Sequence, residues 1–423
     1  MNNPAQKVTL KNGGRLILAP DTTKNVATVL AVFGVGSRYE DAKEAGISHV
    51  LEHMFFKGST KRPNHREIAE FIENIGGENN AFTSKEYTGF YAKVASKHLE
   101  KATDFIADLV LNPLFDATEL EREKGVILQE LAMYDDLPME IVAEKFEEAL
   151  FGANALGRSV IGFRESISAV TRQDLIDYWQ KYYSAQNAVV VLAGNLGMPE
   201  KEASGLTEKY FRFPNATETK TPAIDLNRSK SKILIEKNTE QSHLVIGFPA
   251  SSSSDDDRHP LRLLTIILGG SMSSRMFAEI REKRGLAYAV RTMTEHYHET
   301  GALATYAGVP HDKILPAVEA IINEYRKICQ DITDDEVARA KEILLGKLLI
   351  EFEDTNEVAS HYALSELLLG EIHSPEELQK IYTSLTKNDI LRVAKKYIND
   401  ERMTLSFVGP KLDENELSQI FNL

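Results

Sequence analysis

Residues 47–57 read ISHVLEHMFFK, and the interpretation of the whole chain starts from this stretch. On an α-helix, positions four apart lie on one face, so His49 and His53 point the same way and Glu52 lies beside them. Two neutral imidazoles at this spacing can occupy two corners of a zinc tetrahedron. A third protein ligand would come from elsewhere and the fourth position would stay open for water, which is the pattern of a catalytic zinc site.

Glu52 has the position of a general base in this pattern. Zinc lowers the pKa of water towards neutrality, and a carboxylate next to the metal can take the proton as the water attacks a carbonyl. The five-residue motif is short enough to occur by chance. The alternative is therefore a surface helix with incidental histidines.

The composition argues against several other classes of protein. The chain has 423 residues, which predicts two or three domains, and 43% hydrophobic with 26% charged residues is typical of a soluble globular protein. No apolar run approaches the length of a membrane span. The net charge of −14 argues against a nucleic-acid partner, because neutralising phosphates needs a basic surface.

The cellular location is predicted from the N-terminus and the cysteine content. Residues 1–14 show neither a secretory nor an arginine-rich targeting pattern, and Cys329 is the single cysteine of the sequence. A single cysteine excludes an internal disulfide and fits a reducing compartment. We therefore expect a cytoplasmic protein; the alternative is a processed organellar protein, which would show the same features.

The first 214 residues alternate between strand-like and helix-like segments. Val26–Phe33 is almost wholly apolar, which indicates a central strand buried on both faces. An Asn12-Gly13-Gly14 turn predicts a hairpin before it. Further strands are expected at 79–84, 87–94 and 189–194, and helices at 65–75, 99–110, 117–134 and 171–183.

The predicted helix 117–134 carries four carboxylates that could complete a metal site: Glu119, Glu121, Glu123 and Glu130. Glu123 and Glu130 are seven residues apart, so two turns of helix bring them to nearly the same face. One could be the missing ligand and the other could support it from behind. Helix spacing does not choose among the four, and helix-surface acids are usually solvated.

The second half of the chain repeats the first. Thr386–Asp389 and the strand ending at Gly409 correspond to Thr171–Asp174 and the strand ending at Gly194, both at an offset of 215 residues. Self-similarity of this kind marks a duplicated structural unit. We predict an α+β fold of two homologous halves, each an antiparallel-rich sheet packed with helices. The domains expected are 1–214 and 233–423, joined by a polar linker at 215–232. In the second copy, residues 261–268 read LRLLTIIL and offer no metal ligand.

Three ordered segments resemble a known family. GSRYEDAKEAGISHVLEHMFFKGS (36–59), REKGVILQEL (122–131) and SRMFAEIREKRGLAYAV (274–290) are similar to the signatures of the pitrilysin-type inverted-motif (HxxEH) zinc peptidases, in the mitochondrial-processing-peptidase-like branch of about 420 residues. The resemblance covers nearly the whole chain. It implies a clamshell-type metallopeptidase fold and one Zn²⁺ per chain.

The resemblance also implies roles for individual residues. His49 and His53 would be metal ligands and Glu52 the general base. The family's third ligand follows the motif after about 76 residues, which selects Glu130 and leaves Glu123 as the supporting carboxylate. In such enzymes the substrate adds as an extra strand to an edge strand, here Asn79, Asn80, Ala81, Phe82 and Thr83. The family's Arg/Tyr pair corresponds to Arg281, which would hold the substrate main chain, and Tyr288, which would donate to the oxyanion. Without the family, these two would be taken as a solvated helix residue and a strand aromatic.

The expected activity is zinc-dependent hydrolysis of peptides or unfolded polypeptides inside a closed chamber. The resemblance implies a homodimer in which the Arg/Tyr pair reaches the zinc of the partner chain. Two alternatives remain open: a non-catalytic peptide-binding or assembly subunit of the same fold, and the catalytic half of an obligate heterodimer.

Overall fold

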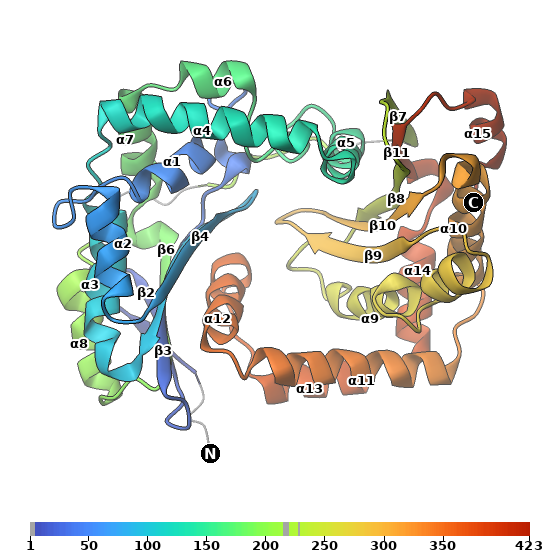
Figure 1. The fold of residues 1–423 in the computed structure, drawn as a ribbon. Coiled ribbons are helices and arrows are strands. Elements are labelled where there is room, and N and C mark those ends of the chain that lie inside the picture. Colours follow the sequence, from blue (N-terminus) through green and yellow to red (C-terminus); the bar gives the residue numbers. More distant parts are fainter. Residues whose placement is uncertain (1–4, 215–219, 227–228) are drawn as a thin grey trace. The chain divides into compact units, whose positions relative to one another are not determined.

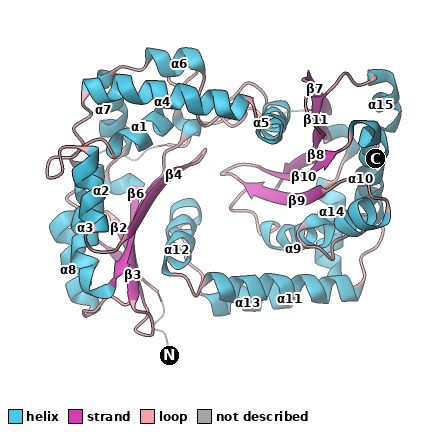
Figure 2. Ribbon diagram, viewed as in Figure 1, coloured by secondary structure: helices cyan, strands magenta, loops and turns pink. Residues whose placement is uncertain are grey.

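The computed structural model describes residues 5–214, 220–226 and 229–423, and these form two compact units. The first unit contains residues 1–131, 159–223 and 349–375, and the second contains 132–158, 224–348 and 376–423. Each unit is built around one sheet (Figures 1 and 2). We describe the units separately.

The first unit has a six-stranded sheet in the order β1-β2-β6-β3-β5-β4. The strands β2 and β6 run parallel, and the other neighbours are antiparallel. As predicted, β3 is an interior strand buried over almost its whole length, and Gly13 takes a positive φ of 81° in the β1–β2 hairpin. The strands are β1 (Gln6–Thr9), β2 (Arg15–Pro20), β3 (Val26–Phe33), β4 (Glu78–Thr83), β5 (Thr88–Ala95) and β6 (Ala188–Gly194).

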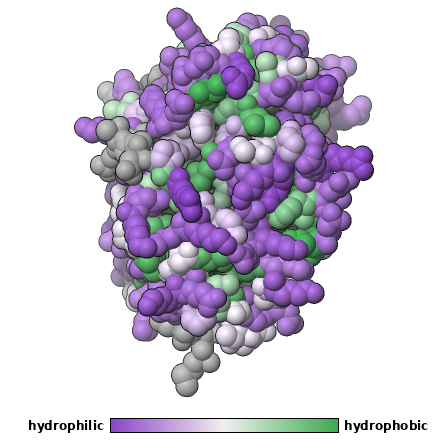
Figure 3. Space-filling view, turned by 90° about the vertical axis from the view of Figure 1, so that its left-hand side faces the viewer, coloured by the Kyte–Doolittle hydropathy of each residue, from purple (hydrophilic) through white to green (hydrophobic). Residues whose placement is uncertain are grey.

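Helices pack on one face of this sheet, and the main hydrophobic core lies between these helices and the sheet. All the helices predicted from periodicity in this part of the chain are present. Gly76, just after the helix His65–Glu73, has a positive φ of 63°, as expected for a glycine that ends a helix. The outer surface over α2, α3 and α8 is mainly hydrophilic, with small scattered apolar patches (Figure 3). The helices are α1 (Ile47–Phe55), α2 (His65–Glu73), α3 (Leu99–Leu111), α4 (Ala117–Asp135), α6 (Arg164–Ala169), α7 (Arg172–Tyr182) and α8 (Glu200–Tyr210).

The second unit repeats the arrangement with five strands in the order β7-β11-β8-β10-β9. Its one parallel pair, β7 and β11, corresponds to β2 and β6. The strands are β7 (Ser231–Glu236), β8 (Ser242–Ala250), β9 (Ala289–His296), β10 (Gly301–Val309) and β11 (Thr404–Gly409). The helices include α9 (Arg258–Gly269), the π-helical segment η4 (Phe277–Lys283), α10 (Ile314–Ile328), α11 (Asp334–Glu351), α13 (Pro375–Ser384), α14 (Lys387–Tyr397) and α15 (Glu414–Ile420).

The repeat extends to the caps of two helices. Thr171 and Asp174 form a capping box at the start of α7, and Thr386 and Asp389 form the same box at the start of α14. In each box the threonine accepts from the backbone of the aspartate and the aspartate accepts from the threonine backbone, so two free amides are satisfied. This matching detail confirms that the two halves are structurally homologous.

Each sheet is also covered by a helix from the other half of the sequence. Helix α12 (Thr355–Leu369) packs on β3 and β6 of the first unit, where Thr355 and Thr28 share a buried hydrogen bond of 2.8 Å. Helix α5 (Pro138–Phe151) packs on β8 and β11 of the second unit, and Ser406 donates to its Val142 carbonyl at 2.6 Å. Sequence periodicity gave no sign of this exchange.

The domain limits at residues 214 and 233 stay a prediction. Part of the predicted linker, residues 215–219 and 227–228, lies outside the described residues. In the part of the chain that is described, every helix is too short or too polar to cross a membrane.

Candidate metal centre

Helix α1 presents His49 and His53 on one face because its opposite face is apolar. Its residues Val50, Leu51 and Met54 are fully buried in the core of the first unit. The two imidazole rings lie one turn apart, with their centroids 4.7 Å from each other. Core packing therefore fixes the direction of the histidine face.

Helix α4 brings a carboxylate to the two histidines. Oε2 of Glu130 lies 3.8 Å from Nε2 of His49 and 3.6 Å from Nε2 of His53. One ligand atom from each of the three residues lies within 4.8 Å of the other two. Tetrahedral zinc ligands stand roughly 3.3 Å apart, so small side-chain movements would close this set around one ion.

The protonation of His49 suits a metal ligand. Burial, together with the neighbouring His53, lowers the pKa of His49 to about 4, so its imidazole is neutral at pH 7. Zinc binds the neutral imidazole. Two nitrogens and one carboxylate oxygen are a donor set that zinc accepts, and the residues present fit this metal.

Glu123, also on α4, contacts the second histidine from behind. Its Oε2 lies 3.1 Å from Nδ1 of His53, and its Oε1 accepts from Nζ of Lys57 at 2.6 Å. The Glu123 side chain is 4% exposed. A carboxylate at Nδ1 places the proton there and leaves Nε2 free to bind a metal. The seven-residue spacing places Glu123 and Glu130 on one face of α4. In the structure Glu130 lies next to both histidines, whereas Glu123 contacts His53 from behind.

Glu52 lies on the same helix and is held by the neighbouring edge strand. Oγ1 of Thr83, the last residue of β4, donates to Oε2 of Glu52. Burial raises the pKa of Glu52, and the Thr83 hydrogen bond and His53 oppose this shift. Strand β4 thus combines two features of the predicted site: it is an edge strand, and its end fixes the orientation of the candidate base.

The remaining residues of β4 are arranged as an edge strand requires. Within the described residues β4 pairs with β5 alone, and Asn79, Asn80 and Ala81 are partly or fully exposed. The ring of Phe82 lies over Gly89, directly opposite on β5, where a Cβ would come within 2.2 Å of it. The outer edge of β4 therefore carries backbone groups that another strand could pair with.

Sequence reasoning missed the group that holds the start of α1. The sequence predicts a polar loop at Arg38–Asp41, but Glu40 is buried and accepts from the backbone amides of Gly46 at 2.7 Å and Ser48 at 2.9 Å. Gly46 itself has φ +92°, and a Cβ there would lie 2.3 Å from the Ile161 carbonyl oxygen. No side chain of the helix caps this end, so a carboxylate from outside the helix does so. No residue spacing indicated this contact.

Arg281 and Tyr288 belong to the second unit. The Arg281 guanidinium lies 4.7 Å from the ring centre of Phe277 and 5.0 Å from that of Tyr288. Tyr288 is 76% exposed. Arg281 lies on a π-helical turn, a feature often found at functional sites. The roles of this pair stay a prediction.

Comparison with known proteins identifies the family. Residues 15–163 match the family model described as Insulinase (Peptidase family M16), and residues 169–344 match Peptidase M16 inactive domain. The chain is 34% identical over 409 residues to the uncharacterized zinc protease YmxG of Bacillus subtilis, covering 96% of this chain and 98% of the relative. It is 33% identical to an uncharacterized zinc protease of Streptomyces coelicolor, covering 97% and 90%.

Solved structures agree with the fold. A protease from Helicobacter pylori matches with a TM-score of 0.90 at 23% identity, covering 97% of this chain and all of that one. The architecture and the family models define the class of zinc-dependent metallopeptidases. The chain belongs to peptidase family M16, which confirms the resemblance, the predicted zinc dependence and the peptide substrate.

Proposed function

We propose that this protein is an endopeptidase that cleaves peptides or unfolded polypeptides with one zinc ion held by His49, His53 and Glu130. The observation that carries the proposal is the convergence of these three side chains from two distant segments, with Glu52 on the same helix. When bound, zinc supplies Lewis-acid chemistry that activates water at neutral pH and polarises a carbonyl.

The protein's own side chains supply the proton transfers. Thr83 donates to Oε2 of Glu52, which leaves Oε1 to accept the proton of the attacking water. The same carboxyl can then deliver the proton to the leaving amine. Glu123 and Lys57 hold His53 so that its Nε2 keeps its direction.

We propose that the substrate binds as an added strand along β4. Backbone pairing with residues 79–83 would give affinity with little dependence on sequence, and it would end next to Thr83 and Glu52. For Arg281 and Tyr288 we propose main-chain binding and oxyanion stabilisation. This assignment rests on the family resemblance alone.

The decisive experiment replaces the base and keeps the ligands. Glu52→Gln should retain stoichiometric zinc, measured by plasma mass spectrometry, and lose roughly 10²–10⁴ of the cleavage rate on an unfolded peptide. Glu73→Gln, an exposed acid on α2, is the matched control and should keep full activity. Full activity of Glu52→Gln would overturn the mechanism, and absence of zinc from the wild type would favour the non-catalytic alternative.

We also propose a closed chamber, a homodimer and a cytoplasmic location. The chamber and the dimer follow from the family resemblance, and the single cysteine fits a reducing compartment. Sedimentation would measure the dimer, and cleavage of a casein-type unfolded chain but not of a large folded protein would support the chamber. An inactive pure protein restored by mixing with a second subunit would instead indicate a heterodimer.

A further inference from the structure

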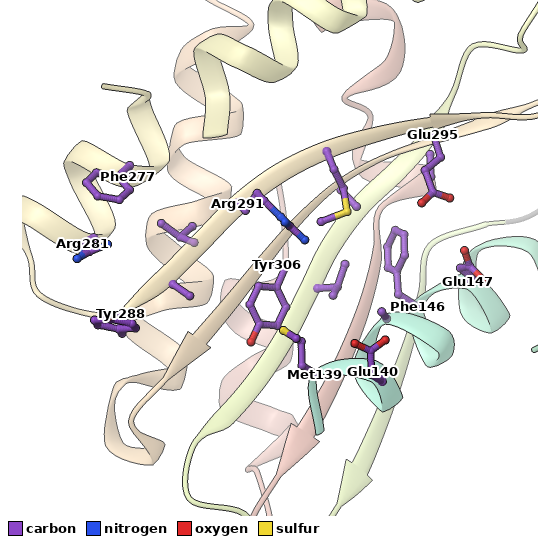
Figure 4. A pocket seen from close by; sticks show the side chains of 17 residues that line it. Met139, Glu140, Phe146, Glu147, Phe277, Arg281, Tyr288, Arg291, Glu295 and Tyr306 are labelled. Carbon is purple, nitrogen blue, oxygen red and sulfur yellow. The ribbon is translucent and has the colours of Figure 1, made fainter. Parts of the chain in front are cut away.

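The second unit contains a cavity of about 500 Å³, and the reaction proposed above uses only its end with Arg281 and Tyr288. Helix α5 borders it on one side, and the pocket-facing side chains of β9 and β10 form its floor (Figure 4). This volume lies in the range of protein ligand sites. All the lining residues belong to the second unit.

The floor of the cavity includes two small side chains. Ala302 and Ala304 of β10 face it, paired with Glu295 and Met293 of β9. In the first unit the corresponding strands carry Phe82 and Tyr91, which pack with Tyr87 against the cluster under α12. By register, Phe82 stands where the second unit has Met293, Gly89 where it has Ala304, and Tyr91 where it has Tyr306. The two sheets therefore differ here by an aromatic ring in one unit and a flexible thioether side chain in the other.

The lining is apolar in the middle and charged towards its ends. Phe146, Val245 and Met293 supply apolar surface, and Arg281 lies with Tyr288 at one end (Figure 4). Glu295 is the last of the β9 residues that line the cavity. It lies four residues beyond Arg291 along the strand and therefore about 13 Å from it. The cavity has a cationic end and an acidic end.

The acidic end has a carboxylate available to a ligand. Among the described residues, Glu295 accepts from the Tyr297 hydroxyl and has no ion pair. Glu140 of α5 also lines the cavity, but it lies towards Tyr306 and Arg291, so Glu295 is the carboxylate of the acidic end (Figure 4). A positively charged group would find uncompensated negative charge here, next to apolar surface that suits its aliphatic stem.

We propose that this cavity is a specificity site for the substrate, which takes an extended segment with a large apolar side chain and, two residues away, a lysine or arginine. In an extended chain, residues i and i+2 lie on one face roughly 6.6 Å apart, the spacing of Met293 and Glu295 on β9. If an apolar side chain of the substrate lies over Met293 and Ala304, the substrate side chain two residues further along therefore lies at Glu295. The inference rests on the proposed peptidase function.

The first test measures cleavage preference with the full-length protein. Two unfolded peptides differ at one position, Phe-Ala-Lys against Phe-Ala-Gln, and the wild type should cleave the lysine peptide about fivefold faster in kcat/KM, as a partly exposed ion pair would give. Glu295→Gln should bring this ratio close to one. The control Glu319→Gln, an exposed acid on α10, should keep it.

A second variant tests the apolar part. Ala304→Met fills the floor of the cavity and should remove the preference for Phe-Ala-Lys over Ala-Ala-Lys. Circular dichroism would verify that the variant is folded. If both preferences survive in Glu295→Gln and Ala304→Met, the specificity site is wrong.

Binding separates this inference from the proposed function. In the Glu52→Gln background, fluorescence anisotropy with the labelled lysine and glutamine peptides should give the same fivefold ratio in Kd, and adding Glu295→Gln should abolish it. That result would support the cavity even if the wild type cleaved nothing. Cleavage with equal Kd values for both peptides would leave the peptidase intact and overturn the cavity.

Discussion

The two units share a strand order and differ in what their helices carry. In the first unit α1 presents His49 and His53 on one side of an apolar helix. In the second unit α9 is buried over residues 259–269 except for the exposed Arg262, and residues 261–268 offer no metal ligand. The capping boxes of α7 and α14 are the same in both. The strands and caps therefore define the scaffold, and a few helix side chains define the chemistry.

The units also differ on the face covered by the exchanged helices. Phe82 and Tyr91 pack on the first sheet beside α12, whereas Met293 and Tyr306, at the equivalent register positions of the second sheet, line a cavity beside α5. We propose a division of labour, with the metal centre in one unit and a binding cavity in the other.

Removing the third ligand should have the largest effect. Mutations of residues that hydrogen-bond to metal ligands typically lower metal affinity by roughly 10–100-fold. Glu130→Gln should lower zinc affinity by more than this, because it removes a direct ligand. Activity should fall with zinc occupancy. The matched control is Glu342→Gln, an exposed acid on α11 of the second unit, and zinc titration against a competing chelator gives both affinities. Equal affinities would show that Glu130 is not a ligand.

Glu123→Ala should have an intermediate effect. It leaves the ligands in place and removes the acceptor at Nδ1 of His53, so zinc affinity should fall about 10–100-fold. Glu119→Gln, on the same helix and away from the histidines, should bind zinc like the wild type. The same chelator competition measures this. An unchanged affinity in Glu123→Ala would mean that Glu123 does not orient His53.

Thr83→Val should slow catalysis about tenfold in kcat, because a hydrogen bond to a charged group contributes roughly 1.5–3 kcal/mol and part of it is recovered from water. KM and zinc content should change little. Thr83→Ser restores the hydroxyl and should restore most of the rate. Steady-state kinetics on one peptide would decide, and a slow serine variant would point to packing rather than orientation of Glu52.

The smallest effect concerns how each unit holds its equivalent helix. Buried Glu40 anchors α1 through backbone amides, whereas Asp257 at the start of α9 binds Arg392, Lys396 and Tyr397 of α14. Burial alone would raise the pKa of Asp257, but these hydrogen bonds lower it to about 2.

Because the folded-state pKa of Asp257 lies below its unfolded value, its contribution is present above about pH 4 and is lost as the pH falls towards 2. Asp257→Asn should therefore lower the free energy of unfolding at pH 7 by about 1–2 kcal/mol, allowing for solvent screening of Arg392 and Lys396. Urea unfolding between pH 7 and 2 would measure it, with the fully exposed Asp256→Asn as control. A penalty that did not shrink at low pH would exclude this ion-pair cluster as its source.

Local signals predicted most of the elements. The apolar run Val26–Phe33, the Asn12–Gly14 turn and the Thr171 and Thr386 caps each encode their structure within a few residues, because backbone geometry and hydrogen bonding are local. The helix exchange was not predictable in this way. The apolar residues of α5 and α12 show that each helix must be buried in part, but not which sheet buries it.

The candidate site also has a part that local spacing predicts and a part that it does not. Spacing on one helix placed His49, Glu52 and His53 together, because 3.6 residues per turn fixes their relative directions. Spacing alone left four acids open on α4, and the ligand roles remain predictions that the measured distances support. The contacts of Lys57, Thr83 and Glu40 had no signal in the sequence.

The sequence by itself determined the strands, the helices, the repeat and the histidine face, since these depend on residues close together in the chain. Only the tertiary structure decided that Thr83 holds Glu52, that Glu40 caps α1, and that a cavity lies between α5 and the strands β9 and β10. These features join segments far apart in sequence. Their partners are chosen by packing of whole elements, a non-local process that residue spacing does not describe.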